Sequence, residues 1–497
     1  MGYFAIALSI LGAYYFLSSV RAWYRLRHFK GPFLASFSYL WLARTTLSGR
    51  AYKIHHENSQ KYGEPFVRIG PDLLITDNAE MIRRINAARS PYRRDSWYDA
   101  FRTNPYSRTI ISCRDEEYHS FLKTRTLPGY SGKEIPSLES DLGDQMANFK
   151  RYIRSKYLST DKKTRLVDLA VALHYYVVDV ITKIGIGQEW GCLASDSDVD
   201  SFIREFNQAS PFIMLCCDVP WARKVFANNF MLRLLGPNVT DKTGVGKMMG
   251  VTKKIVDHRF QPDVEQQNDM LGSFMRHGLN KVQCDAELPV VVLAGSDTSA
   301  SVIKATMLYI MTTPRVYSRL QTEIDGAIKG GTVSSPITQA EAKQLPYLQA
   351  VIYEGIRIQP PSQIFLTKRA PPEGDTVLGY RIPGGTGIAW NLWSLLQDKN
   401  MFGEDAYLFR PERWLQIDAD KKQEMERHVE LIFGYGRYLC SGKHVAMLHL
   451  QKVYFELLRD FDFQLVYPKS AWTERQYNGF IIKDMWVRIT ERQLEAT

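Results

Sequence analysis

One cysteine of this chain lies in a loop suited to presenting a thiolate. Cys440 stands in the segment 433–442, FGYGRYLCSG, where Gly434 and Gly436 predict a tight turn. The residues from 443 onward contain few helix breakers, so they predict a helix with Cys440 near its N-terminus. The helix dipole and the free backbone N–H groups there favour thiolate over thiol. A single thiolate cannot complete a four-ligand zinc site but can be the axial ligand of a haem iron, whereas an isolated cysteine is otherwise a small buried core residue.

A long apolar segment upstream contains small and polar residues in the middle of a predicted helix. Residues 290–311 are long enough for a buried helix, and they contain the sequence AGSDTS at 294–299. Gly295 in mid-helix costs roughly 1 kcal/mol relative to alanine, so some other interaction should compensate. Gly295 shares a helix face with Ser299, as Ala294 does with Thr298. The purely structural alternative is a buried helix in which the Thr298 hydroxyl bonds back to a backbone carbonyl of the same helix.

A charged pair on one predicted helix precedes a further basic motif. Glu354 and Arg357 are three residues apart, which puts them on one helix face within reach of bidentate pairing. On an exposed helix this would be an ordinary salt bridge of little value. The sequence FRPERW follows at 409–414 and contains Arg413.

These four segments, in this order, resemble the cytochrome P450 (haem-thiolate) monooxygenases, and the resemblance spans nearly the whole chain. It implies a mainly α protein with a smaller β portion, the cytochrome P450 fold, preceded by a single N-terminal transmembrane helix. Looser matches at 179–182, 269–274 and 405–409 are most similar to fungal members of the family, particularly the branch around pisatin demethylase.

The resemblance also implies roles for individual residues. Cys440 would be the metal ligand, the axial thiolate of haem b. Asp297 and Thr298 would be catalytic: Thr298 would steady dioxygen, and Asp297 would help to relay protons to it. The residues expected to bind the cofactor are Cys440, Phe433, Gly434, Gly436, Arg437, Gly442, His119, Lys123, Lys368, Ala294 and Gly295.

Other motif residues are expected to be structural or to line the pocket. In the family, the arginine at the position of Arg413 joins Glu354 and Arg357 in a buried triad that supports the haem loop. The segment around Ile364 and Phe365 would line the substrate pocket.

Three positions depart from the family pattern. Tyr438 stands two residues before the cysteine, where the family usually has an Arg or His that reaches a haem propionate. His119 and Lys123 stand near the expected Trp-x-x-x-Arg, and Lys368, with Arg369 as its rival, stands where the family has another such Arg. Each of these basic side chains could bind a propionate, although most basic side chains in a chain with 63 of them are simply solvated.

The N-terminus predicts a retained membrane anchor. Residues 2–20 carry no charge and are long enough to cross a bilayer as a helix. Arg21, Arg25, Arg27 and Lys30 follow this segment, whereas a cleavable signal peptide carries its positive charge before the apolar stretch. We therefore expect an anchor at 1–20, a basic, proline-containing hinge linker at 21–50 and a catalytic domain at 51–497. The domain would face the cytoplasm from the endoplasmic reticulum membrane; the alternative is a buried soluble helix.

Composition limits the partners. The net charge of +10 suits an anionic membrane face and an acidic redox partner, and the dispersed charges do not suggest nucleic acid. Six cysteines show no metal-pair spacing, and lone Gly-x-Gly pairs are too weak to suggest a nucleotide site. The chain is therefore expected to lack a flavin or nicotinamide domain of its own, and the resemblance implies that electrons from NADPH arrive through an external NADPH–cytochrome P450 reductase, with cytochrome b5 as a second candidate donor.

The coarse pattern agrees with the resemblance. Helices are predicted at 166–185, 288–311, 312–329, 340–357 and 443–458, and strands at 65–69, 73–76, 376–382 and 463–465. Variable segments that cover the pocket are expected at 92–118 and 200–228.

The implied reaction is oxidation of an apolar small molecule, as a tailoring step in fungal terpenoid, polyketide or alkaloid biosynthesis. One alternative keeps the haem thiolate but catalyses isomerisation, dehydration or a peroxide-driven reaction. The other is a non-enzymatic membrane haem carrier or sensor. Neither needs the Asp297–Thr298 pair, whose presence favours monooxygenation.

Overall fold

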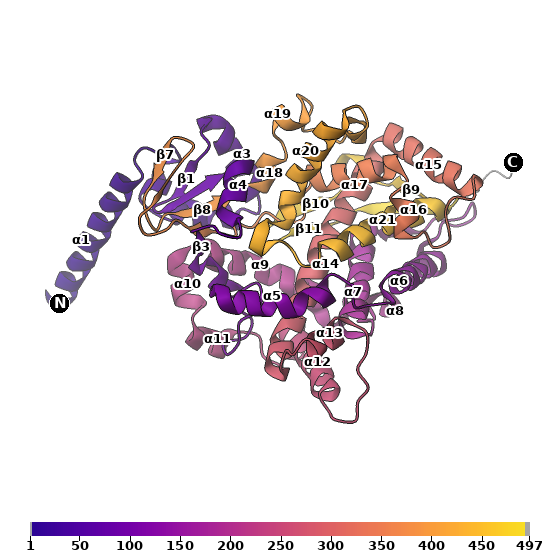
Figure 1. Cartoon of the computed structure of the whole chain (residues 1–497), viewed down its shortest axis with the longest axis horizontal. Helices are drawn as coiled ribbons and strands as arrows, with labels where there is room; N and C mark the ends of the chain where they lie inside the picture. The colour runs from indigo at the N-terminus through magenta and orange to yellow at the C-terminus, as the bar shows by residue number, and fades with distance from the viewer. Residues whose placement is uncertain (1, 493–497) are drawn as a thin grey trace.

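The computed structural model describes residues 2–492. Helices fill most of the molecule, and the largest sheet lies toward the end from which the N-terminal helix projects (Figure 1). The predicted mainly α architecture with a smaller β portion is therefore confirmed. Residue 1 of the predicted anchor and residues 493–497 of the predicted catalytic domain lie outside the described residues.

The helices of the first part of the chain are α1 (Gly2–Arg25), α2 (Leu40–Leu47), α3 (Ala51–Tyr62), α4 (Ala79–Asn86), α5 (Glu116–Tyr130), α6 (Leu138–Tyr152), α7 (Leu169–Ile186), α8 (Cys192–Ser195), α9 (Phe202–Asp218), α10 (Pro220–Phe226), α11 (Asn229–Leu235), α12 (Gly244–Arg259) and α13 (Met270–Arg276). The later helices are α14 (Lys281–Thr312), α15 (Pro314–Lys329), α16 (Gln339–Ala342), α17 (Pro346–Ile358), α18 (Leu392–Leu395), α19 (Lys399–Phe402), α20 (Ala419–Val429) and α21 (Lys443–Asp460). The strands are β1 (Val67–Gly70), β2 (Leu73–Thr76), β3 (Arg93–Arg94), β4 (Leu166–Asp168), β5 (Lys368–Arg369), β6 (Asp375–Val377), β7 (Tyr380–Ile382), β8 (Gly387–Trp390), β9 (Phe461–Leu465), β10 (Thr473–Gln476), β11 (Phe480–Lys483) and β12 (Trp486–Glu491).

The strands join segments that are far apart in sequence. The largest sheet has the order β1-β2-β8-β5-β3, in which β2 and β8 run parallel and the other neighbours run antiparallel. Its β3–β5 pairing sets Arg94 opposite Lys368. A second sheet, β4-β12-β9, ties the start of α7 to the C-terminal region, and β6–β7 and β10–β11 are separate hairpins.

Two apolar helices form the centre of the helical part. Helix α14 begins at a capping box between Asn280 and Gln283, and it packs against α7, α17 and α21. The Asp168 side chain accepts hydrogen bonds from the first turn of α7, and Gly187 ends that helix with φ of 79°. Both helices are long and apolar enough to cross a membrane, but most residues in their apolar windows are buried inside the protein. They are therefore core helices of the folded domain.

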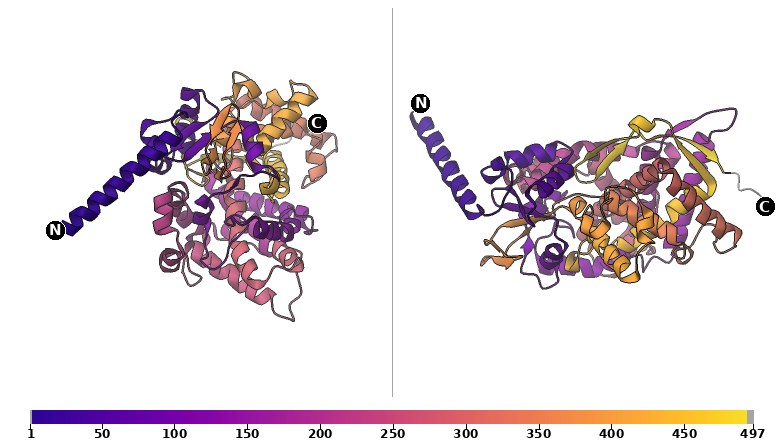
Figure 2. Two further views of the ribbon diagram at one scale, coloured as in Figure 1. Left: turned by 60° about the vertical axis from the view of Figure 1, so that its left-hand side comes forward. Right: turned by 90° about the horizontal axis from the view of Figure 1, so that it is seen from above.

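Helix α1 projects from the body of the molecule in all three views (Figures 1 and 2). Large apolar side chains along it are exposed, among them Phe4, Ile10 and Phe16. The helix runs to Arg25, past the expected end of the anchor at residue 20, and residues 26–50 contain α2. The boundaries of the anchor and the linker remain predictions.

Several predicted boundaries move for identifiable reasons. The helix expected at 166–185 begins at Leu169, because the three preceding residues pair with β12 as a strand. The helix expected at 340–357 is two elements, since Pro346 starts α17 at its first helical position. The strand expected at 376–382 is a hairpin that turns at Leu378 and Gly379, both with positive φ.

Candidate functional site

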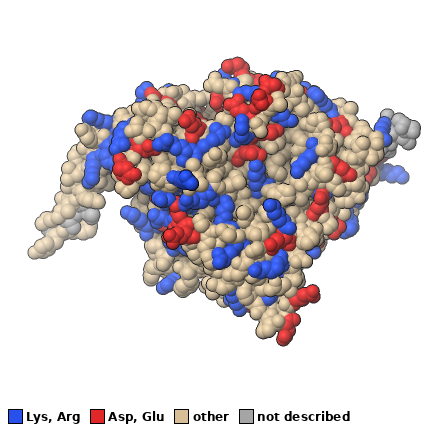
Figure 3. Space-filling view, in the orientation of Figure 1, with Lys and Arg blue, Asp and Glu red and all other residues tan. Residues whose placement is uncertain are grey.

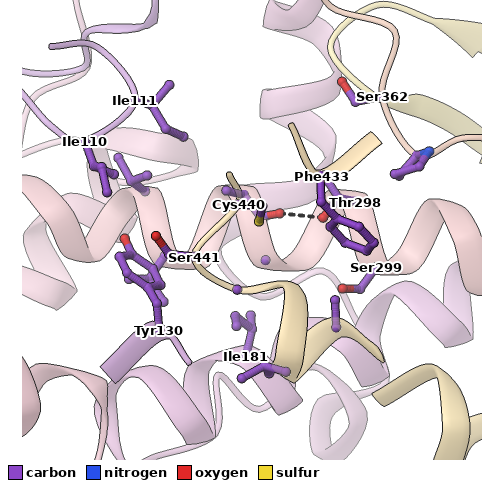
Figure 4. Close-up of a pocket in the computed structure, with 18 of the residues that line it drawn as sticks. Ile110, Ile111, Tyr130, Ile181, Thr298, Ser299, Ser362, Phe433, Cys440 and Ser441 are labelled. Carbon is purple, nitrogen blue, oxygen red and sulfur yellow. Dashed lines mark hydrogen bonds between the residues drawn. The ribbon is translucent and has the colours of Figure 1, made fainter. Parts of the chain in front are cut away.

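A cavity of about 290 Å³ lies between α14 and the loop that contains Cys440 (Figure 4). Cys440 and Thr298 both line it, although 142 residues separate them in sequence. Cys440 is exposed, whereas the other five cysteines are buried. The side chain that the sequence singled out thus opens onto the cavity and is not a core residue.

Two glycines shape the cysteine loop. Gly434 and Gly436 adopt φ of 80° and 58°, in the left-handed region that side chains disfavour. A Cβ on Gly436 would lie 2.5 Å from the backbone oxygen of Asn86, at the end of α4. The backbone N–H of Cys440 then donates to the oxygen of Phe433 at 2.6 Å, which closes the loop. The predicted tight turn is present, and it packs directly against α4.

The electrostatics of the thiol differ in part from the expectation. The Cys440 thiol opens onto an internal cavity, where the surrounding protein desolvates it and raises its pKa, while the backbone N–H groups of Gly442 and Lys443 and the cation of Lys123 act in the opposite direction. The N-terminus of α21 therefore favours the thiolate as predicted, but desolvation is the larger effect. A metal ion at the sulfur would reverse this balance, because a coordinated thiol is deprotonated.

Small residues of α14 form the wall that faces the cysteine. Ala294, Gly295, Thr298 and Ser299 all line the cavity. The Thr298 hydroxyl donates to the Ala294 oxygen at 2.8 Å (Figure 4, dashed line). Thr298 thus bonds back to its own helix and also lines the cavity, and its role toward dioxygen stays a prediction.

The close approach of α7 explains the mid-helix glycine. A Cβ on Gly295 would lie 2.5 Å from Cγ1 of Ile181. Any larger residue would push α7 away from α14, and the packing contact compensates for the low helix propensity of glycine.

Asp297 occupies a different face of α14. It is not among the residues that line the cavity, and its Oδ1 lies 3.2 Å from Nε2 of His174 on α7. The structure therefore separates the two predicted catalytic residues: Thr298 faces the cavity and Asp297 faces the neighbouring helix.

One end of the cavity is basic. His119, Lys123 and Arg94 line it, and Nζ of Lys368, which is not a lining residue, lies 3.1 Å from the centre of the ring of Tyr438, which is one. Burial is the main cause that lowers the pKa of Lys368 to about 5 and that of His119 to about 3. In the described part of the chain, Lys368 Nζ, His119 Nδ1 and Arg94 Nε have no hydrogen-bond partner.

The other predicted basic residues have protein partners. Lys123 donates to the backbone oxygens of Arg437 and Leu439, at 2.9 and 2.7 Å, so it braces the cysteine loop. Arg437 pairs with Glu116 and is not among the residues that line the cavity. Arg369, the rival of Lys368, pairs with Asp72 and Asp95.

Arg94 is the residue that the sequence analysis did not single out. Its Nη1 donates to the backbone oxygens of Ile110, Ile111 and Cys113, and its guanidinium carbon lies 4.5 Å from the centre of the Tyr438 ring. The only feature of the sequence that placed Arg94 near the pocket was its position in the segment 92–118. Its pairing with Lys368 depends on a strand register that links distant parts of the chain.

The expected buried triad is formed. Glu354 and Arg357 are fully buried and make two hydrogen bonds of 2.8 Å, and Arg413 Nε lies 3.0 Å from Glu354. Trp414 donates to the same carboxylate at 2.9 Å. Arg357 also donates to the backbone oxygens of Leu396, Ala406 and Leu408, so the triad fixes the segment that precedes the cysteine loop.

The predicted pocket segments are only partly at the cavity. Ile110 and Ile111 line it, as do Pro361 and Ser362, whereas Phe365 packs in a separate apolar cluster with Trp97. The aromatic residues of the segment 92–118 therefore contribute to this cluster more than to the cavity wall.

The residues around the cavity fit a haem. The thiol and the small side chains of α14 line one largely apolar cavity, and His119 and Arg94, which also line it, each have a buried nitrogen atom without a partner among the described residues. Lys368, which is not a lining residue but lies against the ring of Tyr438, has a third such atom. The two carboxylates of a haem could satisfy these groups. Among the described residues no cluster of three His, Cys, Asp or Glu side chains could hold a metal by itself. The single cysteine therefore suits an iron whose other ligands come from a porphyrin.

Comparisons with known proteins agree with this geometry. The cytochrome P450 family profile matches residues 29–484. Cytochrome P450 monooxygenase ABA1 of Pyricularia oryzae is 42% identical over 98% of this chain and 96% of its own length. Cytochrome P450 monooxygenase aba1 of Botryotinia fuckeliana is 44% identical over 94% and 92%, and cytochrome P450 monooxygenase cicH of Emericella nidulans is 30% identical over 94% and 93%. The chain therefore belongs to the cytochrome P450 family and is a monooxygenase.

Proposed function

We propose that Cys440 would supply the thiolate ligand of a haem b held in the cavity, and that the enzyme oxidises an apolar small molecule there. The observation that carries the proposal is that Cys440 and Thr298 line the same cavity, together with the basic side chains of Arg94, His119 and Lys123. The haem would supply the activation of dioxygen, using electrons from NADPH delivered through a reductase.

The residues of the chain would position the reactants and control protons. Thr298 holds a proton at Oγ1 beside the cavity, and the apolar side chains of Ile110, Ile111 and Val290 exclude water and favour an apolar substrate. Asp297, one residue away on another face, would exchange protons between this site and the protein interior.

Lys368, Arg94 and His119 would bind the haem propionates. Lys123 and Arg437 would instead stabilise the cysteine loop and its contact with α5. This assignment differs from the sequence-based set in three respects: Arg94 is added, and Lys123 and Arg437 are given structural roles.

The reductase would dock on the basic face beside the cysteine loop. Figure 3 shows Lys and Arg side chains over the part of this face where α4 and α5 lie in Figure 1. Arg84 and Arg93 are 49% and 60% exposed there, and Gly436 of the cysteine loop packs on the end of α4. A basic surface so close to the thiolate suits an acidic electron donor such as NADPH–cytochrome P450 reductase or cytochrome b5.

The exposed apolar side chains of α1 support a membrane anchor, and the arginines that follow it support a catalytic domain on the cytoplasmic side of the endoplasmic reticulum. Fungal relatives named cytochrome P450 monooxygenase support a tailoring step in secondary metabolism as the biological role.

The reduced, carbon-monoxide-bound difference spectrum tests the proposal. The wild-type protein and a Cys192→Ala control, which changes a buried cysteine of α8, should both give the red-shifted Soret band of a thiolate ligand. Cys440→Ala should lose that band. A histidine-type band in the wild type, or a thiolate band that survives in Cys440→Ala, would contradict the assignment.

A further inference from the structure

Asp297 lies at one end of a buried chain of polar side chains that crosses the α7–α14 interface. His174 Nε2 is 3.2 Å from Asp297 Oδ1, and His174 Nδ1 is 3.1 Å from the ammonium of Lys304. His174 and Lys304 are 6% and 3% exposed, so water cannot replace these contacts. Neither residue lines the cavity.

The chemistry of the three groups fixes which nitrogen atom of His174 carries the proton. A charged lysine can only donate, so His174 Nδ1 accepts from Lys304. The proton of a neutral imidazole then resides on Nε2, the nitrogen on the side of Asp297; the 3.2 Å contact is a close polar approach without the alignment of a hydrogen bond. The cation, the neutral ring and the anion together carry no net charge, which is the arrangement that burial tolerates best.

The surroundings agree with this charge assignment. Burial lowers the pKa of Lys304 to about 8, with the charges of Asp297 and Asp168 opposing the shift. Burial and the Lys304 cation lower the pKa of His174, while Asp297 and Asp198 oppose them. At neutral pH a charged lysine and a neutral histidine are therefore both favoured.

The second carboxylate oxygen of Asp297 lies near a segment that pairs with a residue of the cavity lining. Oδ2 lies 4.0 Å from the position that a Cβ on Gly479 would take. Gly479 pairs with Ser362, which lines the cavity. One oxygen of Asp297 is thus held by α7, and the other faces the segment that borders the reaction site.

We propose that His174 and Lys304 are positioning residues for monooxygenation: they hold Asp297, the neighbour of Thr298 in sequence, as an oriented carboxylate for the proton exchange proposed above. The inference rests on the proposed role of Asp297 and Thr298 in proton delivery. It assigns a function to two buried residues on different helices, neither of which touches the cofactor site.

The first test is spectroscopic and does not depend on turnover. Infrared spectra of protein labelled with ¹³C-aspartate are recorded at pH 7, and Asp297→Asn identifies the Asp297 bands. Lys304→Met should shift the Asp297 bands, because it removes the buried cation that contacts His174, whereas Lys304→Arg should restore the wild-type spectrum.

The second test measures how electrons are used. With reductase and a substrate that the enzyme turns over, Lys304→Met and His174→Phe should lower product formed per NADPH consumed by about tenfold, with the remainder released as hydrogen peroxide. His174→Gln retains an amide donor and Lys304→Arg retains the charge, so both should stay within about twofold of wild type. The reduced carbon-monoxide spectrum should be unchanged in all four variants.

The outcomes separate the two proposals. A wild type without a thiolate band would remove the proposed function, and the infrared spectra would still decide whether His174 and Lys304 control the Asp297 carboxylate. Identical Asp297 bands in the wild type and Lys304→Met would overturn the inference, as would equal coupling in the two proteins. Should Lys304→Met fail to fold, Lys304→Gln provides the same loss of charge with a polar side chain.

Discussion

Arg94 and Lys368 lie directly opposite each other on the antiparallel strands β3 and β5, and both approach the ring of Tyr438. Burial and the charge of Arg94 lower the pKa of Lys368 to about 5, so its amine is uncharged at neutral pH when no anion is present. A carboxylate at this position would pair with Arg94 and restore the charge of Lys368, which is why we assign both residues to the haem propionates.

Lys368→Met should make the haem-free protein more stable and the haem-loaded protein less able to keep its cofactor. The folded pKa of Lys368 is about 5, well below that of a lysine in the unfolded chain, so the folded state binds fewer protons between these values. The stability of haem-free wild type should therefore rise with pH from about 6 to 9, by at most about 1.4 kcal/mol per pH unit from this group. Thermal unfolding across that range measures the slope.

The variant should lack this contribution, so its advantage over wild type should be largest at low pH. Haem transfer to an excess of an acceptor protein should be faster from Lys368→Met than from wild type. Lys53→Met, which changes an exposed lysine, serves as the control. Equal pH slopes in wild type and Lys368→Met would contradict the assignment of a buried, unpartnered amine.

Gly436→Ala should destroy the cysteine loop, and Gly63→Ala should not. Both glycines have φ near 60°, so both variants carry the same kind of backbone strain. Only at Gly436 would the new Cβ meet another segment, 2.5 Å from the Asn86 oxygen, whereas Gly63 has nothing within 4 Å. The backbone strain alone costs about 1–2 kcal/mol in either variant. The clash in Gly436→Ala should in addition abolish the thiolate-type carbon-monoxide band. A normal band in Gly436→Ala would show that the contact with α4 is not needed.

Removing residues 2–25 should release the protein from membranes without unfolding the catalytic domain. Helix α1 has exposed apolar side chains along its length, so its removal should lower membrane association. Fractionation of expressing cells measures the distribution, and the carbon-monoxide spectrum measures the integrity of the site. Arg25 donates to the Gly384 oxygen at 2.8 Å, and a shorter deletion of residues 2–20 keeps this contact as a control. Full membrane retention of both truncated forms would contradict the proposed anchor.

The sequence predicted those parts of the site that depend on local chemistry. Cys440, its two glycines and the small residues of α14 could be assigned because a tight turn and a helix face are properties of neighbouring residues. Arg94 and His174 could not, because strand pairing brings Arg94 to Lys368 and helix packing brings His174 to Asp297. The helix boundary at Leu169 moved for the same reason, since β12 pairs with the three residues before it.

Glu287 supports the loop that contains Ile110 and Ile111, two residues of the cavity lining. It is fully buried in α14, and its Oε1 accepts a hydrogen bond of 2.7 Å from the backbone N–H of Ile110. Burial raises its pKa to about 8, against about 4.3 in an unfolded chain. Between these values the folded state keeps a proton that the unfolded state has lost, so this carboxyl makes the protein less stable as pH rises from about 4.5 to 8.

Glu287→Gln keeps an acceptor for the Ile110 N–H and removes the titration, so its melting temperature should gain on wild type progressively from pH 6 to pH 8. Glu287→Leu removes the acceptor as well, and the unpartnered N–H should cost about 1–3 kcal/mol at every pH. Thermal unfolding of wild type, Glu287→Gln and Glu287→Leu, all prepared in the same way, distinguishes the loss of the titration from the loss of the hydrogen-bond acceptor. A constant difference between Glu287→Gln and wild type would mean that Glu287 does not titrate in this range. Ile110 and Ile111 line the cavity, so a change in their loop should alter ligand preference. Glu287→Leu should change the ranking of a set of apolar ligands, measured by their spectral shifts, more than Glu287→Gln does.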